Sequence, residues 1–368
     1  MDSLRLEQVD SIEGLRALAP AWDRLWRASE VSLPTARAEL VAQWLECFAP
    51  RRELRVLAVR RGDELAAALP LVGRRVKGVV PVGDLTWNDW SASGELLVDP
   101  AGDADSVLDL LATGIEGLSW PLVWLDFVPV EAPWWQALLR VLTRRGAHVD
   151  VHPRYRIGQV EIGGAFEPYL AQRSKNLRRS MQKDLRRLEQ AGPVTFRLLS
   201  SFTPEEVDRC VGEAFEIERR SWKRSDGQTV LDAAGVFEFY CRQARQLAEW
   251  GELRLAFLDH GGRPVACEFG FTAKRVYHSL KVAYDESLRQ YGPGHLLRMH
   301  LVRALHAGGD AALVDFQGPM TDALAQWSTR SYPIGRVVIA SRRARSLLWF
   351  AAYRGLAAAV RRLRKSKP

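Results

Sequence analysis

A chain of 368 residues is longer than a typical single domain and fits two domains of about 150 to 200 residues, each able to bury its own core. Hydrophobic residues make up 47% and charged residues 26%, which excludes a disordered or fibrous protein. The formal net charge of +8 is concentrated in residues 341–368, which hold nine Arg and Lys residues and no acid. The rest of the chain is nearly neutral, which argues against a general nucleic-acid-binding surface.

Two features bear on the compartment. Residues 1–10 are polar and mixed in charge, without the apolar segment of a secretory signal, so we expect a cytoplasmic protein. The four cysteines are widely spaced and form no CxxC pair: Cys47, Cys210, Cys241 and Cys267. We therefore expect buried thiols and no metal site or disulfide framework.

The first half begins with a predicted strand at residues 4–9 and a helix through residues 15–26, whose apolar residues recur at three- and four-residue spacing. A second helix is predicted at 38–48. Two short strands, 54–60 and 64–72, follow as a hairpin, because Arg61-Gly62-Asp63 is typical of a turn. A buried strand at 122–128, a helix at 134–145 ended by Gly146, and a strand at 147–152 complete this half.

The second half begins with a long basic helix, predicted at 169–190, and a strand at 195–199. Helices are predicted from Thr203 to about residue 222 and at 236–250. Three consecutive strands at 253–259, 264–273 and 275–284 predict an antiparallel meander. A helix at 295–307, a strand at 312–316, a short helix at 324–327 and a strand at 335–340 follow. The two halves share this order only loosely, which permits a duplicated fold.

A glycine-bearing turn separates the last meander strand from the next helix. Gly292 and Gly294 allow close approach of the backbone to a ligand, while Pro293 fixes the turn. Free amides at the start of a helix, together with the helix dipole, favour a bound phosphate. The turn therefore predicts an anion site, with a plain structural turn as the alternative.

Five motifs in order carry a resemblance to a known family. They are Arg173-Ser174-Lys175-Asn176-Leu177-Arg178-Arg179, Ser221-Trp222-Lys223, Lys281-Val282-Ala283-Tyr284-Asp285, Tyr291-Gly292-Pro293-Gly294 and Asp315-Phe316-Gln317-Gly318. Over about residues 165–340 the chain resembles the GNAT acyltransferases, in particular bacterial CelD-like proteins of cellulose or exopolysaccharide biosynthesis, and more distantly the Fem peptidyltransferases.

The resemblance implies an α/β (α+β) fold of two GNAT-like domains in tandem, each a mixed, mainly antiparallel sheet flanked by helices. The implied parts are a degenerate domain at 1–160, an acyltransferase domain at 161–340, and a basic amphipathic helix at 341–368. Only the second domain keeps the cofactor turn, which implies acetyl-CoA or another acyl-CoA as co-substrate. The implied cofactor-binding residues are Arg289, Gln290, Tyr291, Gly292, Gly294 and His295. The family pattern Q/R-x-x-G-x-G/A fits only from Arg289 and with a proline inside.

Direct acyl transfer needs a base for the acceptor and an acid for the leaving thiolate. Glu268, Asp285 and Asp315 are the candidate bases, and Glu268 stands in an apolar run where burial raises a carboxyl pKa. The alternative for Glu268 is an ion pair with Lys281. Tyr284 is the candidate acid, since tyrosine takes this role in many GNAT enzymes; the alternative is a core tyrosine.

The basic helix and nearby cations predict contacts with an anionic or polar substrate. We assign Trp222, Lys223, Lys281 and Arg178 to substrate binding; a solvated cationic face is the alternative for the helix. The partner of that helix could be the 3′-phosphate of CoA, a polyanionic glycan, a lipid phosphate, or tRNA if the enzyme follows the Fem branch.

These features predict an acyl-CoA-dependent N- or O-acyltransferase acting on a sugar, an amino acid, a glycan or a biosynthetic intermediate. The alternatives are a Fem-like enzyme using aminoacyl-tRNA, in which case alone nucleic acid is a partner, and a non-catalytic scaffold in polysaccharide assembly. The apolar stretch of the last helix is about 14 residues, too short for a membrane span of roughly 20. That helix is expected either to dock on the protein body or to contact the inner membrane peripherally.

Overall fold

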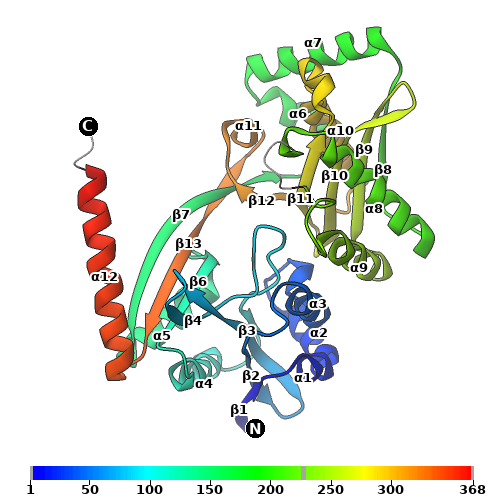
Figure 1. The fold of residues 1–368 in the computed structure, drawn as a ribbon. Helices are drawn as coiled ribbons and strands as arrows, with labels where there is room; N and C mark the ends of the chain where they lie inside the picture. Colours follow the sequence, from blue (N-terminus) through cyan, green and yellow to red (C-terminus); the bar gives the residue numbers. More distant parts are fainter. Residues whose placement is uncertain (1–2, 225–228, 366–368) are drawn as a thin grey trace. The chain divides into compact units, whose positions relative to one another are not determined.

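The computed structural model describes residues 3–224 and 229–365, without the side chains of 356–365 (Figure 1). The chain forms two compact units. Unit 1 comprises residues 1–31, 35–155 and 333–368, and unit 2 comprises residues 32–34 and 156–332. The chain therefore passes from unit 1 to unit 2 within one strand, β7 (His148–Glu161), and returns within another, β13 (Arg330–Ala340).

Unit 1 is built on a mixed sheet in the order β1-β2-β3-β4-β6-β13. Its strands are β1 (Leu4–Val9), β2 (Leu54–Arg61), β3 (Glu64–Val76), β4 (Val80–Asp84), β6 (Leu122–Pro129) and the second part of β13, with a two-residue β5 (Leu97–Val98) paired to β3. All neighbours are antiparallel except β4 and β6, which are parallel.

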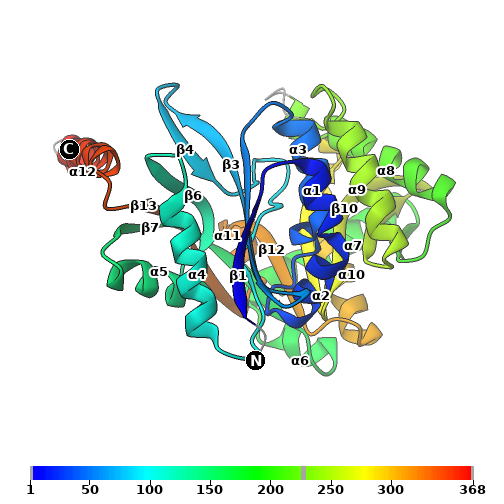
Figure 2. The same cartoon turned by 90° about the horizontal axis from the view of Figure 1, so that it is seen from below.

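Helices cover both faces of this sheet (Figure 2). On one side α2 (Ala19–Ala28) packs on β3, with α1 (Ile12–Ala17) and α3 (Ala38–Phe48) packed against it. On the other side α4 (Ala104–Gly117) packs on β1, β2 and β3, with α5 (Pro133–Arg144) packed against it. The predicted helix through 15–26 is two helices, because Pro20 lies in the first turn of a new one. Helix α12 (Ala344–Lys365) follows β13.

Unit 2 is built on a sheet in the order β8-β9-β10-β11-β12-β7. Its strands are β8 (Val194–Leu199), β9 (Leu253–His260), β10 (Arg263–Ala273), β11 (Val276–Tyr284), β12 (Leu313–Pro319) and the second part of β7. Strands β9, β10 and β11 form the predicted antiparallel meander. Strands β11 and β12 are parallel, and β12 is antiparallel to β7.

The helices of unit 2 also form two layers (Figure 1). Helices α8 (Pro204–Arg219) and α9 (Val236–Glu249) cover the face that carries Phe269, whose ring contacts those of Phe215 and Tyr240. Helices α6 (Phe166–Ala171), α7 (Lys175–Ala191) and α10 (Pro293–Gly308) cover the face that carries Tyr277. The predicted helix at 169–190 is interrupted, because the Ser174 side chain accepts a hydrogen bond from the Leu177 amide and caps α7.

The two units repeat one topology. In each, four antiparallel strands are followed by a helix and a strand parallel to the fourth, and the last position is an antiparallel strand. That last strand comes from the other half of the sequence: β7 completes unit 2 and β13 completes unit 1. The element order that the two halves loosely share is thus explained by a duplicated fold. It consists of two GNAT-like sheets in tandem, each flanked by helices.

This exchange changes the boundaries expected from the sequence. Residues 334–340 were expected in the second domain, but Ile334 and Val337 pair with Pro129 and Leu125 of β6. The C-terminal helix was expected as a separate part that either docks on the protein body or contacts a membrane, and its Phe350 packs in a cluster with Val82, Leu122, Val338 and Ala340. Local hydrophobic periodicity cannot reveal a strand partner some 200 residues away, so the prediction kept the chain order.

Candidate active site

The parallel strands β11 and β12 pair over a short length. Their ladder joins Val276 to Leu313, Tyr277 to Val314 and His278 to Asp315, and β11 then continues to Tyr284 with no further ladder pair to β12 among the described residues. Backbone amides and carbonyls on this edge of β11 need other hydrogen-bond partners. One of them, the Val282 carbonyl, accepts from the Lys223 ammonium at 3.2 Å.

The predicted turn follows β11 and starts α10. Gly292 adopts the left-handed conformation, with φ of 60°, and Pro293 occupies the first turn of the helix. No side chain among the described residues caps this end, and no acid lies in the first turn of α10. A helix of 16 residues therefore presents the positive end of its dipole without a cap from its own residues.

Only one backbone amide of the predicted anion site is open to a ligand among the described residues. The Gly292 amide donates to the Arg289 carbonyl at 3.0 Å, so it is not available to a ligand. The His295 and Leu296 amides donate to the Gly292 carbonyl. Within the described part of the chain, only the Gly294 amide of this turn has no hydrogen-bond partner. The turn is half-buried, with Pro293 packed inside.

Charged side chains of α7 lie beside this turn. Arg187 donates to the Gln290 carbonyl at 3.2 Å, and its guanidinium lies 5.4 Å from the Tyr291 ring centroid. Asp184 is also close, since a Cβ built at Gly292 would lie 3.1 Å from its Oδ2 atom. The open amide therefore has both a cation and one carboxylate near it. Gln290 and Tyr291 contribute to the turn through this contact with α7.

Tyr284 lies at the turn, where β11 ends. A Cβ built at Gly294 would be 3.1 Å from the Tyr284 Cδ1 atom, so the ring covers one side of the glycine. Burial raises the pKa of Tyr284, and the neighbouring Glu286 raises it further while Arg289 opposes the shift. The phenol is therefore protonated at neutral pH and can donate a proton. Arg289 is largely exposed and pairs with Glu286 at 3.3 Å.

Glu268 is buried on the α10 face of the sheet, with 1% of its surface exposed. Burial raises its pKa, while Arg298 of α10 and the hydroxyl groups of Ser279 and Tyr277 lower it. The two hydroxyls lie near the carboxyl, but neither carboxyl oxygen of Glu268 has a hydrogen-bond partner among the described residues. Glu268 thus has the raised pKa that was predicted, in a position closed to solvent.

The alternative predicted for Glu268, an ion pair with Lys281, is wrong. The register places Glu268 opposite Val282, and Lys281 opposite Phe269. Because alternate residues of a strand point to opposite faces, Lys281 projects toward the α8 and α9 layer. The cation on the Glu268 side is Arg298, whose guanidinium also lies 4.8 Å from the Phe316 ring centroid.

The other two candidate bases have structural partners. Asp285 pairs with Arg220 at 3.3 Å and accepts from the Ser287 amide, capping the 3-10 turn η3 (Glu286–Tyr291). Asp315 is 4% exposed and accepts from Gln159 at 2.8 Å and from the Gln317 side chain at 2.8 Å. Both carboxylates hold backbone in place around the site.

Two histidines of the region stay neutral at neutral pH. Burial lowers the pKa of His278 to about 4 although Asp315 raises it. His278 Nδ1 lies 2.9 Å from the Gln317 amide nitrogen and Nε2 lies 3.2 Å from the Ser32 carbonyl. Burial also lowers the pKa of His295, and the nearby Arg298 lowers it further.

The Ser221-Trp222-Lys223 motif links the 3-10 turn η2 (Trp222–Arg224) to the sheet. The Lys223 ammonium contacts the buried Glu218 carboxylate at 2.9 Å as well as the Val282 carbonyl. This ion pair makes Lys223 a structural residue at the β11 edge, while Trp222 is 52% exposed beside it. Arg178 is half-buried on α7, and its Nε atom has no partner in the described structure.

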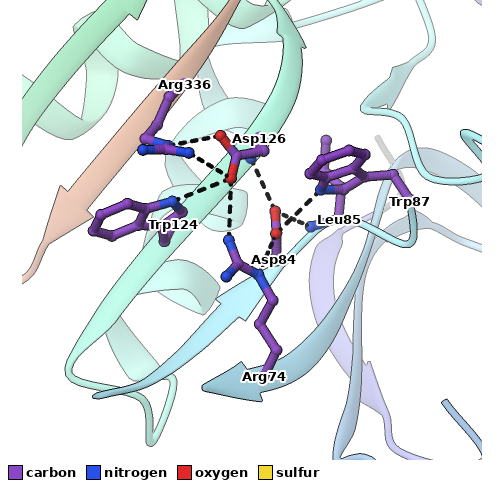
Figure 3. Close-up of polar contacts among 7 residues, drawn as sticks. All are labelled: Arg74, Asp84, Leu85, Trp87, Trp124, Asp126 and Arg336. Atoms are coloured by element: carbon purple, nitrogen blue, oxygen red, sulfur yellow. Dashed lines mark hydrogen bonds and ion pairs between the residues drawn. The ribbon is translucent and has the colours of Figure 1, made fainter. Parts of the chain in front are cut away.

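The equivalent place in unit 1 is filled by charged side chains (Figure 3). Strand β4 ends at Asp84, which accepts from the Asp126 amide of β6 at 2.9 Å and from Arg74 at 2.6 Å. Asp126 in turn accepts from Arg336 of β13 at 2.6 Å and from the Trp124 indole. These bonds join β4, β6 and β13 at the point where the parallel ladder between β4 and β6 ends.

The helix start of unit 1 also differs from that of α10. Asp103 caps α4 by accepting from the Ser106 amide, and Asp105 adds a second carboxylate in the first turn. An anion approaching this helix would be repelled by both carboxylates. Of these two equivalent helices, only α10 of unit 2 therefore has the features of the predicted anion site.

Sequence reasoning missed several residues of the site. Arg298 lies four residues after Gly294 on α10 and could have been sought as the cation that a buried Glu268 requires. Asp184 and Arg187 lie in the predicted basic helix, but neither was assigned to the site. Their position beside the turn depends on how α7 packs on unit 2, for which the sequence carries no local signal.

Residues 175–323 match a family model described as an acetyltransferase (GNAT) domain. Over these residues the chain carries a GNAT acetyltransferase domain. The matched segment lies inside unit 2 and contains the meander, the glycine turn and β12. The enzyme class is accordingly that of a GNAT-type acyltransferase, as the resemblance implied.

The similarity in fold to solved structures covers both units and not the GNAT domain alone. FemX has a TM-score of 0.60 at 12% identity, covering 90% of this chain and 96% of that chain. The C-terminal domain of a putative lysylphosphatidylglycerol synthetase from Agrobacterium fabrum has a TM-score of 0.54 at 11% identity, covering 93% and 96%. L-PGS from Bacillus licheniformis has a TM-score of 0.50 at 12% identity, covering 89% and 92%. A search of curated proteins finds no match.

Two further observations concern membranes and metals. Among the described residues, no helix has the length and apolar character needed to cross a bilayer. The same residues contain no group of three or more His, Cys, Asp or Glu side chains arranged to hold a metal ion.

Proposed function

We propose that unit 2 transfers an acyl group from acyl-CoA to an amine or hydroxyl group of a small-molecule or glycan acceptor. The observation that carries this proposal is the open Gly294 amide at the uncapped start of α10, with the Tyr284 ring beside it. Acyl-CoA brings a pyrophosphate for that amide and a thioester for the neighbouring strand edge. Acetyl-CoA is the donor we expect first.

Three groups around the turn support an anionic donor. Arg187 lies over Tyr291, exposed Arg289 lies on η3, and the positive end of the α10 dipole is at the turn. The edge of β11 beyond His278, without ladder pairs to β12, offers backbone groups to the amides of the pantetheine arm. Arg178, half-buried on α7, is a candidate contact for the 3′-phosphate.

The transfer itself needs one acid and no covalent enzyme intermediate. The acceptor nitrogen or oxygen attacks the thioester carbonyl, a C–N or C–O bond forms, and the C–S bond breaks. Tyr284, whose raised pKa keeps it protonated, gives its proton to the departing thiolate and regains one from solvent. The proton lost by the acceptor passes to water.

The roles of the acids follow from their surroundings. Glu268 is closed to solvent, and Asp285 and Asp315 hold backbone, so we assign these three carboxyl groups to positioning the site. Trp222, half-exposed at the edge of β11, is a candidate surface for the acceptor. The resemblance to CelD-like proteins supports a sugar or glycan acceptor in polysaccharide biosynthesis, inside the cytoplasm.

A second donor class, aminoacyl-tRNA, is supported by a different observation. The similarity in fold to FemX covers both units, and α7 carries exposed cations next to the turn. The Fem resemblance implies such a donor. Transfer would use the same turn and the same acid with an ester in place of a thioester.

A thermal-shift panel separates these donors. Acetyl-CoA, malonyl-CoA, a longer acyl-CoA and uncharged tRNA are each added to the full chain. Acyl-CoA in large excess over its Kd should raise the melting temperature by about 5 to 10 °C. No shift with any acyl-CoA contradicts the first proposal, and a shift with tRNA alone supports the second donor class.

A further inference from the structure

We propose that the start of α12 and the β3–β4 hairpin of unit 1 form a docking surface for an anionic lipid membrane. The two elements share one hydrophobic cluster, in which Phe350 of α12 packs with Val82, and Val76 and Val80 of the hairpin pack against it. They therefore present neighbouring surfaces of the same unit. The inference does not depend on the acyl-transfer proposal.

One face of α12 is fixed to the sheet. Phe350 is 6% exposed, and the Tyr353 ring lies 5.0 Å from that of Trp124 in an edge-on contact. Ser346 is buried and lies 3.0 Å from the Ser341 hydroxyl. Residues 346, 350 and 353 recur at three- and four-residue spacing, so they define the docked face of the helix.

The opposite face of α12 is apolar and exposed. Leu348 has 73% of its surface exposed, the largest value among the exposed large hydrophobic residues in the described part of the chain. Ala344, Ala351, Ala352 and Gly355 are exposed on the same side of the helix, and exposed Arg345, three residues before Leu348, borders them. This stripe of apolar side chains, with Arg345 at its margin, can enter the boundary between lipid headgroups and acyl chains, because the long arginine side chain reaches back to the headgroups.

The hairpin adds a second apolar point next to cations. Val79 is 63% exposed at the tip, and Arg75 and Lys77 of the same turn are exposed beside it. The helix carries exposed Arg345 and Arg354 at the margins of its apolar stripe. Both elements thus place an exposed apolar side chain between basic ones.

Charge and apolarity together identify the partner. Residues 341–368 contain nine Arg and Lys residues and no acid, so an anionic surface is favoured. A nucleic acid would satisfy the cations but would leave Leu348 and Val79 against phosphates and sugars. An anionic bilayer satisfies both, because basic side chains meet headgroups while apolar ones enter between them.

The test is co-sedimentation of the full chain with vesicles of phosphatidylcholine alone or mixed with phosphatidylglycerol. We expect binding to the mixed vesicles, weakening with added salt, and little to phosphatidylcholine alone. Leu348→Glu and Arg354→Glu should each weaken binding by about tenfold or more, without changing the melting temperature, since both side chains are exposed.

Arg263→Glu is the matched control, because it makes the same charge change at an exposed position in unit 2. It should leave vesicle binding unchanged. Absence of binding by the unaltered chain, or equal binding by Leu348→Glu, would overturn the proposal. A third result would also overturn the proposal: competing RNA abolishes vesicle binding, and Leu348→Glu binds that RNA as well as the unaltered chain does.

Discussion

Substituting Gly294 by Trp tests the anion seat in unit 2. A Cβ at this position would lie 3.1 Å from Tyr284 Cδ1 and 3.6 Å from Cε1, so alanine needs a shift of only a few tenths of an ångström. Gly294 is not among the left-handed glycines, so a side chain adds no backbone strain there. An indole, in contrast, has to displace the Tyr284 ring or cover the open amide.

The expected loss follows from one hydrogen bond. An amide donating to a charged phosphate oxygen contributes about 1.5 to 3 kcal/mol, so losing it weakens binding roughly 10- to 150-fold. At ligand 100 times the original Kd, stabilisation falls from about 2.7 kcal/mol to about 1.4 kcal/mol or less. A melting-temperature rise of about 5 to 10 °C should therefore fall by half or more.

The assay is a thermal-shift titration with acetyl-CoA on the unaltered chain, Gly294→Trp and the control Gly294→Ala. The alanine variant keeps the amide and should keep most of the shift. A Gly294→Trp protein that melts at the normal temperature without ligand and shows the full acetyl-CoA shift would refute the reasoning, since the pyrophosphate would then lie elsewhere.

Three further predictions concern the acid, the buried pair and unit 1. Tyr284→Phe should lower kcat at least tenfold with little change in KM for acyl-CoA, measured by steady-state kinetics; an unchanged kcat would assign the proton to another group. Arg298→Met should destabilise unit 2 by about 3 to 5 kcal/mol in urea unfolding by leaving Glu268 without its cation, and adding Glu268→Gln should recover part of the loss; additive effects would show that the two do not interact. Burial raises the pKa of Asp84 to about 6 from 3.8 despite Arg74, so the folded state binds the proton more tightly, and the contribution of Asp84 to stability should fall by about 3 kcal/mol between pH 3.8 and 6. Asp84→Asn should remove that slope from urea unfolding measured across this range, and equal slopes in both proteins would contradict it.

Local sequence signals predicted the elements that form the site. Alternation and turn residues located the three meander strands, and the Gly-Pro-Gly turn located the start of α10 to within two residues. Helix α4 was missed although its signal is present: Asp103 is a good N-cap, and Val107, Leu111 and Ile115 follow at helical spacing. A second Asp-Phe pair, Asp126-Phe127, also marks in unit 1 the strand that Asp315-Phe316 marks in unit 2.

Pairing between distant segments could not be predicted in the same way. Lys281 was the nearest cation to Glu268 by strand order, but the ladder shifts between Phe269 and Gly270 and places Lys281 on the opposite face. A single bulge changes which side chains meet, and no residue type fixes its position. The open amides were also overcounted, because only the structure shows the Gly292 amide bonded to Arg289.

The most direct test of the account is a crystal structure of the full chain with acetyl-CoA. We expect a pyrophosphate oxygen about 3 Å from the Gly294 amide nitrogen and the thioester sulfur within hydrogen-bonding reach of the Tyr284 hydroxyl. Acetyl-CoA bound with its pyrophosphate away from this turn, or with its sulfur out of reach of Tyr284, would contradict the proposed site.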